Sequence, residues 1–347
     1  MRGRVLLIGT GGTIAGAAPS SSQTLGYTPG AIGVDALRRS IGAIADGETA
    51  RIDLRTSQPF SIGSQHMTSA HWLALAREVD GASREHDAIV IAHGTDTMEE
   101  TAFFLDLVCP RETPIVLTGA MRPATAISAD GPSNLGFACL IGAEQAARGR
   151  GPLVAFCDSA WLGWHARKVH TLALDAFDGT GHDAQALRVS DAVAWRVDAE
   201  AARREAAARP AFDRQRIEHH GAPLPRVGLI AQHVDADPAI VDWHLSEGAR
   251  GLVFAGTGQG TMPDAMRAAL ARASRAGCLV VRSTRVAGGP VIPDTEPVEA
   301  DRDDALGFVA SHWLPAIKAR ILLQCCLAIG LGKADLPEVR RRFDAYR

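Results

Sequence analysis

The sequence predicts a two-domain α/β protein, and three of its features lead to this prediction. Short runs of aliphatic and β-branched residues alternate with longer amphipathic segments, which is the pattern of strands joined by helices. The apolar runs are continuous, as expected of parallel strands covered on both faces. The length of 347 residues corresponds to about two domains at roughly 150 residues each.

The elements follow this alternation along the chain. The first strand is expected at 5–8, directly before a glycine-rich turn. Further strands are expected at 88–92, 115–117, 153–156, 227–230, 251–254 and 279–282. Helices are expected near 69–79, 98–108, 133–148, 239–247, 264–276, 315–329 and 336–346. Thr68 is the predicted N-cap of the first of these helices, and the spacing of Thr97 and Glu100 is that of a capping box at the start of the second.

The stretch 197–226 interrupts the alternation. It is rich in Ala and Arg, contains His219 and His220, and has two prolines near its end. We expect an exposed connection here, although its first half could form a helix. The predicted organisation is therefore an N-terminal domain at 1–196, a linker at 197–226 and a smaller C-terminal domain at 227–347.

Composition excludes several classes of function. The net charge is −3 and aromatic residues make up 5% of the chain, so nucleic-acid binding is not expected. No apolar stretch approaches the length of a membrane span. The N-terminal apolar run is too short for a signal peptide, and we expect a cytoplasmic protein. The cysteines and histidines show no CxxC or HExxH spacing, so no metal site is predicted.

Two threonine-bearing loops follow predicted strands. Thr10 and Thr13 lie in the Gly-rich stretch 9–16, whose spacing does not match a dinucleotide fingerprint. A loop threonine is commonly a turn or cap residue, but it becomes a nucleophile when a neighbour takes its proton. Thr95 and Asp96 occupy the equivalent position after the strand at 88–92. Asp96 could hold a substrate ammonium group, or it could be a local turn acceptor.

Three other polar side chains are candidates for the same site. Lys168 could act as a base for a threonine hydroxyl if burial lowers its pKa, although a lysine is more commonly a solvated surface charge. Ser64 and Gln65 carry neutral donors and acceptors that suit a small zwitterion. Taken alone, they would be ordinary loop residues.

Several motifs resemble the bacterial L-asparaginases over nearly the whole chain. The motifs are TGGTIAG at 10–16, HGTDTMEETAFFLDL at 93–107, GAMRPATAISADGPSNL at 119–135, VVRSTRVAGG at 280–289 and GFVASHWLPAIKARILLQ at 307–324. The segment GYTPGAIGVDAL at 26–37 resembles the type II-like branch. The resemblance implies a large flavodoxin-like α/β domain, a smaller C-terminal α/β domain, and a homotetramer built as a dimer of dimers whose sites are shared between subunits. It also implies that no metal or organic cofactor is used.

The resemblance also assigns catalytic roles. Thr13 matches the primary nucleophile of the family, and Tyr27 matches the tyrosine that hydrogen-bonds this threonine. Thr95, Asp96 and Lys168 match the second catalytic group.

The remaining correspondences concern the substrate and the neighbouring subunit. Ser64 and Gln65 match residues that grip the α-carboxylate and α-amino groups, and Asp96 matches the main partner of the ammonium. Gln259 stands where an asparagine contributed by the neighbouring subunit is typical of the type II branch. Glu296 is the best match for the acidic residue that joins Thr13, with Glu299 as the competitor.

The resulting prediction is an amidohydrolase that converts L-asparagine to L-aspartate and ammonia through an acyl-enzyme. The alternatives are a glutaminase-asparaginase of mixed specificity, an amidase subunit that supplies ammonia to a tRNA-dependent partner, and a catalytically silent amino-acid sensor. Because one methylene of misfit commonly costs about 10–200-fold, we expect asparagine to be preferred over glutamine by at least about tenfold.

Overall fold

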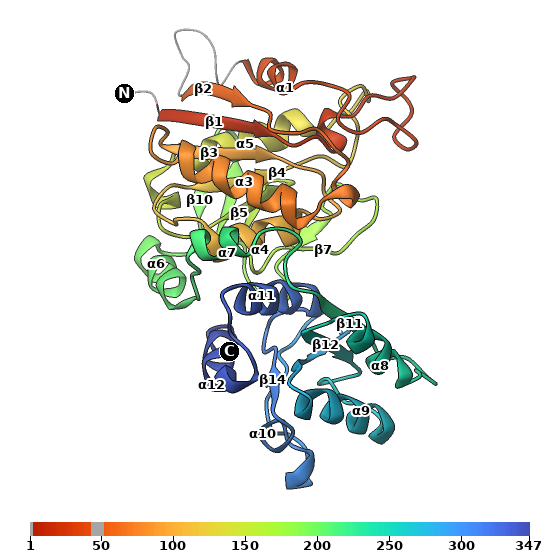
Figure 1. Ribbon diagram of the computed structural model, residues 1–347. Coiled ribbons are helices and arrows are strands. Elements are labelled where there is room, and N and C mark those ends of the chain that lie inside the picture. The colour runs from red at the N-terminus through yellow and green to blue at the C-terminus, as the bar shows by residue number, and fades with distance from the viewer. Residues whose placement is uncertain (1–2, 43–51) are drawn as a thin grey trace. The chain divides into compact units, whose positions relative to one another are not determined.

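The structure, a computed structural model, describes residues 3–42 and 52–347 and divides into two compact units, Met1–Ala207 and Ala208–Arg347. Each unit has its own sheet flanked by helices (Figure 1), so the α/β prediction is confirmed. The division falls inside the stretch 197–226, which holds the helices α6 (Ala199–Ala208) and α7 (Arg214–His220). No helix in the described ranges is long and apolar enough to cross a membrane.

The first unit is built on an eight-stranded sheet in the order β10-β9-β6-β5-β4-β3-β1-β2. Strands β2, β1, β3, β4 and β5 are parallel, in the 2-1-3-4-5 order of flavodoxin-like folds. The other three strands extend the sheet in antiparallel fashion. The strands span Gly3–Gly9 (β1), Ile52–Ser57 (β2), Ala88–Ala92 (β3), Ile115–Thr118 (β4), Leu153–Phe156 (β5), Ser159–Leu162 (β6), Ala186–Val189 (β9) and Ala192–Trp195 (β10).

Within the described residues, four helices connect the parallel strands: α1 (Val34–Ser40), α3 (Ser69–Ala82), α4 (Met98–Val108) and α5 (Gly131–Ala143). Helices α3 and α4 pack against each other, and Figure 1 shows α3 crossing in front of the sheet. Helix α5 is buried on nearly all sides and packs on the central strands. A separate two-stranded ribbon, β7 (Arg167–Lys168) and β8 (Phe177–Asp178), follows β6.

The second unit has a four-stranded parallel sheet in the order β11-β12-β13-β14. The strands are Val227–Ala231 (β11), Gly251–Gly256 (β12), Leu279–Thr284 (β13) and Phe308–Ala310 (β14). The helices are α8 (Ala239–Ser246), α9 (Asp264–Arg275), α10 (Asp303–Leu306), α11 (Ala316–Ala328) and α12 (Leu336–Asp344). Six of the seven predicted helices and all seven predicted strands are observed within three residues of their expected ends; the helix expected at 133–148 ends earlier, at Ala143.

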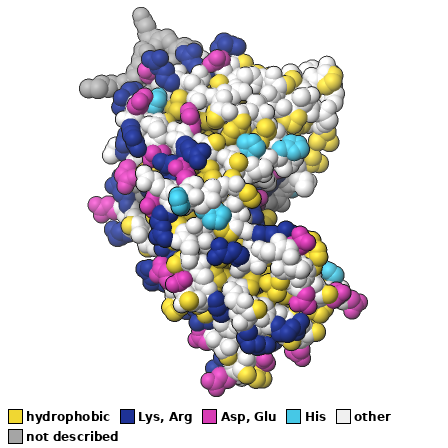
Figure 2. Space-filling view, in the orientation of Figure 1, with side chains coloured by type: hydrophobic (Ala, Val, Ile, Leu, Met, Phe, Trp, Pro, Cys, Tyr) yellow, Lys and Arg dark blue, Asp and Glu magenta, His cyan; other side chains and the backbone are white. Residues whose placement is uncertain are grey.

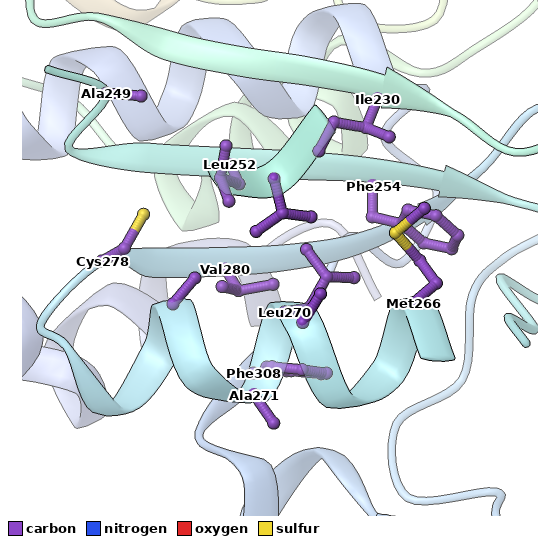
Figure 3. Packing of buried hydrophobic residues seen from close by; sticks show 13 residues of the cluster. Ile230, Ala249, Leu252, Phe254, Met266, Leu270, Ala271, Cys278, Val280 and Phe308 are labelled. Atoms are coloured by element: carbon purple, nitrogen blue, oxygen red, sulfur yellow. The ribbon is translucent and has the colours of Figure 1, made fainter. Parts of the chain in front are cut away.

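The core of the second unit lies between its sheet and α8 and α9 (Figure 3). Leu252, Phe254 and Val280 point from the strands toward Met266 and Leu270 of α9, and all five are buried. Every third or fourth residue of α9 is apolar, which places one helix face on the sheet. On the molecular face shown in Figure 2, Lys and Arg side chains are mixed with Asp and Glu, in keeping with the small net charge.

Truncation of Leu270 tests this packing. Leu270→Ala should lower the free energy of unfolding by about 2–5 kcal/mol, because the fully buried side chain leaves a cavity between α9 and the sheet. Urea-induced unfolding measures the loss. Arg272→Ala on the exposed face of α9 is the control, because its 3.7 Å ion pair with exposed Asp242 is worth less than about 1 kcal/mol. Equal losses in the two variants would contradict the assignment of Leu270 to the core.

Candidate active site

Three loops meet through their backbones at the carboxyl edge of the first sheet. Gly11 and Gly12, after β1, have φ values of +99° and +78°. A Cβ atom on Gly11 would lie 2.4 Å from the Ile62 carbonyl oxygen, and one on Gly12 would lie 2.4 Å from the Gly94 Cα. The Gly12 N–H donates to the Ile62 carbonyl at 2.9 Å. Only glycine permits these contacts, which join the loop after β1 to those after β2 and β3.

This meeting point is where the strand order reverses. Strand β1 lies between β2 and β3, so the chain leaves β1 toward one side and enters β3 on the other. Open parallel sheets bind ligands at the carboxyl ends of the strands beside such a switch. Thr13 follows Gly12 directly, and Thr95 follows Gly94. The two threonines therefore come from neighbouring strands at the position expected for a binding crevice.

Thr13 is paired with Tyr27. The Thr13 Oγ1 and the Tyr27 hydroxyl are 2.5 Å apart, and either atom can be the donor. Thr13 is only 9% exposed at the start of the 3-10 helix Thr13–Ala15. The structure therefore brings together the first pair that the sequence predicted.

The loop that carries Tyr27 is tied down at its base. Ala17 and Thr28 exchange two backbone hydrogen bonds of 3.1 and 3.0 Å. The Ala18 N–H donates to Thr125 Oγ1 at 2.9 Å, which attaches the loop to the segment before α5. Gly16 lies directly under the Tyr27 ring, since a Cβ atom there would be 2.8 Å from the ring carbon Cδ2. The contact with Thr125 carried no signal in the sequence.

Thr95, Lys168 and Asp96 form the second group. The Lys168 Nζ donates to Thr95 Oγ1 at 2.8 Å and to Asp96 Oδ1 at 2.7 Å. Ribbon β7–β8 holds this lysine, which pairs with Phe177. The Lys168 side chain is 17% exposed and that of Asp96 is 60% exposed. The alternative of a solvated surface lysine is therefore wrong.

Ser64 joins the loop after β2 to the second group. Its Oγ accepts a hydrogen bond from the Asp96 N–H at 3.2 Å, and its carbonyl accepts one from Thr97 Oγ1 at 2.9 Å. Thr97 is the N-cap of α4, as predicted, but the predicted capping box is wrong because the hydroxyl bonds to Ser64 rather than to its own helix. The predicted cap at Thr68 is confirmed, and its partner in a capping box is His71.

Gln65 is exposed beside Ser64. Its side-chain amide lies over Gly63, where a Cβ atom would come within 2.5 Å of the Gln65 Oε1. The amide therefore lies against its own turn.

A buried histidine supports the Thr95 loop, and the sequence analysis did not identify it. His93 is fully buried; its Nδ1 is 2.7 Å from the Gly94 carbonyl and its Nε2 is 3.1 Å from Thr101 Oγ1. Trp72 Nε1–H donates to the same hydroxyl at 3.0 Å. Since a carbonyl only accepts, Nδ1 carries the proton, and the chain runs from Trp72 through Thr101 and His93 to Gly94. Its only sequence signal is a histidine at the end of a buried strand.

Gln259, Glu296 and Glu299 belong to the second unit. Gln259 is exposed in the loop after β12. The Glu296 carboxylate is 3.3 Å from the Arg267 guanidinium, with 28% of the side chain exposed. Glu299, at the start of the 3-10 helix Glu299–Asp301, is exposed.

No group of three or more His, Cys, Asp or Glu side chains in the described residues is arranged to hold a metal ion. The polar groups at the carboxyl edge of the first sheet are hydroxyls, one amine, one carboxylate and amides. Such a set can bind a small zwitterion and transfer protons.

Comparison with known families matches both units. The sequence model of the Asparaginase, N-terminal family matches residues 4–201, and that of the Glutaminase/Asparaginase C-terminal domain matches residues 226–343. These two matches leave only the chain ends and a short connection uncovered.

Individual proteins are similar over their full lengths. The chain is 34% identical to L-asparaginase 2 of Escherichia coli (strain K12), covering 99% of this chain and 93% of that protein. It is 32% identical to the glutaminase-asparaginase of Acinetobacter glutaminasificans, covering 99% and 100%. The crystal structure of a probable cytoplasmic L-asparaginase from Campylobacter jejuni superposes with a TM-score of 0.86 at 32% identity, covering 99% and 100%.

The buried histidine gives the protein a pH-dependent stability. Burial lowers the pKa of His93 to about 4, whereas an unfolded histidine has a pKa near 6.5. The unfolded chain therefore binds more protons between these values, and stability present above about pH 6.5 is lost as the pH falls toward 4. We expect this group alone to cost about 2 kcal/mol between pH 7 and pH 5.

Unfolding free energies at the two pH values measure this effect. His93→Gln should show a smaller difference between pH 7 and pH 5 than the parent, whereas His219→Gln at an exposed position of α7 should match the parent. A difference that is unchanged in His93→Gln would contradict the assignment.

Proposed function

This chain belongs to the asparaginase family, and from that membership we propose that it hydrolyses L-asparagine to L-aspartate and ammonia. The observation that carries the proposal is the pairing of two threonine hydroxyls with proton-carrying partners on loops that touch. Thr13 is paired with Tyr27, and Thr95 with Lys168. The intact pairs argue against a silent sensor, which would need neither.

We propose Thr13 as the nucleophile. Its Oγ1 attacks the side-chain amide carbon while its proton passes to the Tyr27 oxygen, and the phenolic proton of Tyr27 moves on to the amide nitrogen. The C–N bond then breaks, ammonia leaves with the transferred proton, and Thr13 holds an ester. Water hydrolyses the ester to aspartate and restores the Thr13 hydroxyl.

The second group supports both steps. The chain from Thr95 through Lys168 to Asp96 can donate or accept a proton at the amide or at the attacking water. The Thr95 amide N–H donates to no other residue in the described part of the chain, so it is open to the oxyanion that forms on the substrate.

Three residues supply the contacts for the amino-acid end. Asp96 uses Oδ1 for Lys168, and its Oδ2 has no hydrogen-bond partner among the described residues, so that it can accept the substrate ammonium. Ser64 and Gln65 offer a hydroxyl and an amide to the carboxylate. A bound substrate would cover these groups, and any of them left unpaired would then cost about 1–3 kcal/mol, which selects for an α-amino acid.

A mixed glutaminase-asparaginase is the second candidate, because a relative of that name aligns with the chain over its full length. If Ser64 and Asp96 hold the carboxylate and the ammonium of the substrate, the distance from this end of the substrate to Thr13 is fixed. This fixed distance disfavours glutamine, which is longer than asparagine. We also propose that the enzyme acts in the cytoplasm, as the name of the Campylobacter jejuni neighbour states for that protein.

Ammonia release from both amides tests the activity and the nucleophile together. The parent should release ammonia from asparagine with a kcat/KM at least about tenfold above that for glutamine. Thr13→Ala should lose about 10⁴-fold in kcat without loss of stability. Thr24→Ala, an exposed hydroxyl in the loop that carries Tyr27, is the control and should match the parent. A Thr13→Ala variant within tenfold of the parent would remove Thr13 from this role.

We further propose that the active protein is a homotetramer, a dimer of dimers in which each site takes Gln259 and a glutamate from the neighbouring subunit. Glu296 was the sequence-based choice for this glutamate and remains a candidate. Its ion pair with Arg267 would have to be broken or shared, whereas Glu299 is exposed. This difference gives Glu299 an advantage that the sequence did not indicate.

Mixing inactive variants tests the shared site and decides between the two glutamates. Random pairing of Thr13→Ala with a variant of the correct glutamate makes half of the dimers hybrids, each with one intact site of two, so about a quarter of the parent activity should return. We expect recovery with either Glu296→Gln or Glu299→Gln, whichever is inactive alone.

Thr13→Ala mixed with Lys168→Met is the control, because both changes lie in the first unit and no hybrid site is intact. Failure to recover activity with either glutamate variant, once subunit exchange is confirmed, would contradict the shared site.

A further inference from the structure

Beyond these roles, we propose that Arg282 of β13, with Asp303 as its counter-ion, is the positioning residue for the two loops that the second unit contributes to the site. The inference rests on the proposed function for its kinetic consequence and on the contacts of the second unit for its geometry. The mechanism above assigns no role to either residue.

Arg282 binds both loops through one buried guanidinium. Its Nη1 donates to the Gln259 carbonyl at 2.5 Å, and its Nη2 donates to the Ile292 carbonyl at 2.7 Å. Gly260 packs on the same side chain, since a Cβ atom there would lie 3.1 Å from the Arg282 Nη1. Arg282 is 6% exposed, so these bonds are shielded from water.

Asp303, at the far end of the loop that begins at Ile292, also binds the Arg282 guanidinium. Its two oxygens accept from Arg282 Nε at 2.8 Å and Nη2 at 2.6 Å. Its Oδ2 also accepts from the Asp294 N–H at 3.1 Å. The two ends of the segment 292–303 are therefore held together, because Ile292 and Asp303 bond to Arg282 and Asp294 bonds to Asp303.

Glu296 and Glu299 both lie inside this closed segment. The contacts of Arg282 and Asp303 therefore set the position of the acidic side chain, whichever of the two glutamates acts. The same guanidinium fixes the backbone at Gln259, so the amide and the carboxylate are held at one common point. A buried Arg–Asp pair suits this task because its planar fork binds four oxygen acceptors in fixed directions.

Lysine at this position separates positioning from charge. Arg282→Lys keeps a cation for Asp303 but cannot reach all four oxygens. Arg111→Lys is the matched control: Arg111 is also largely buried, bonds Asp106 at 3.0 Å and donates to the carbonyls of Asp106 and Ala206. Arg111 lies in the first unit beyond the carboxyl end of α4, whereas Thr95 precedes the start of that helix.

Hydrogen exchange and kinetics on the full-length protein decide the proposal. In Arg282→Lys, amides of 257–260 and 292–303 should exchange at least about tenfold faster, while those of β12 and β13 keep the parent rates. The kcat for asparagine should fall by about 10²-fold, the cost of about 1 Å of misplacement. Arg111→Lys should keep both the loop exchange rates and kcat.

The exchange rates test whether Arg282 holds the two loops, and kcat tests whether these loops serve the site. Unchanged exchange in both loops of Arg282→Lys would overturn the positioning role, whatever the activity. Faster exchange with kcat within twofold of the parent would equally overturn the claim that these loops serve the site. A parent that releases no ammonia would contradict the proposed function, while the exchange rates would still decide whether Arg282 holds the loops. If Arg282→Lys fails to fold, Asp303→Asn, which keeps one oxygen acceptor, must show the same exchange and kinetic changes.

Discussion

The arrangement of the first unit depends on the absence of two side chains. Gly11 and Gly12 let the loops after β1, β2 and β3 touch backbone to backbone. A Cβ atom on either glycine would lie 2.4 Å from a backbone atom of the neighbouring loop. Thr13 and Thr95 each follow a glycine of this contact, so one packing constraint places both hydroxyls. A side chain at either glycine would separate the loops, and displacements near 1 Å are enough to cost about 10²-fold in rate.

The two units stabilise their functional loops by different means. In the first unit the Thr95 loop rests on a neutral chain from Trp72 through Thr101 and His93, in which every donor has one acceptor. In the second unit a single buried ion pair, Arg282–Asp303, binds two loops at once. A neutral chain avoids the desolvation cost of buried charge but controls one loop. An arginine incurs that cost and gains several directed bonds in return.

The fold could be predicted wherever the apolar pattern is local and continuous. The predicted strands with continuous apolar runs were located to within two residues, and Ala88–Ala92 was located to the residue. The buried strand β14 was missed because it has only three residues. Strands with one exposed face were missed: β2 alternates buried and exposed residues, and β9 and β10 lie at the exposed end of the sheet. Ribbon β7–β8 has two residues per strand, too few to show any period, although it holds Lys168.

The residues of the candidate site could likewise be predicted only where the signal is local in the sequence. Residue types and spacing identified Thr13, Thr95 and Asp96 as candidates, but the bond between Lys168 and Thr95 spans 73 residues and follows from topology alone. The capping-box pattern at Thr97 led to a wrong prediction because Ser64, from another strand, competes for the hydroxyl. Glu296 and Glu299 differ in a way that sequence cannot express, since what distinguishes them is the ion pair with Arg267. A carboxylate already paired must lose that partner to act elsewhere, and the cost of separating a partly buried pair grows as water is excluded. Which acid acts therefore depends on the charges that already surround each one.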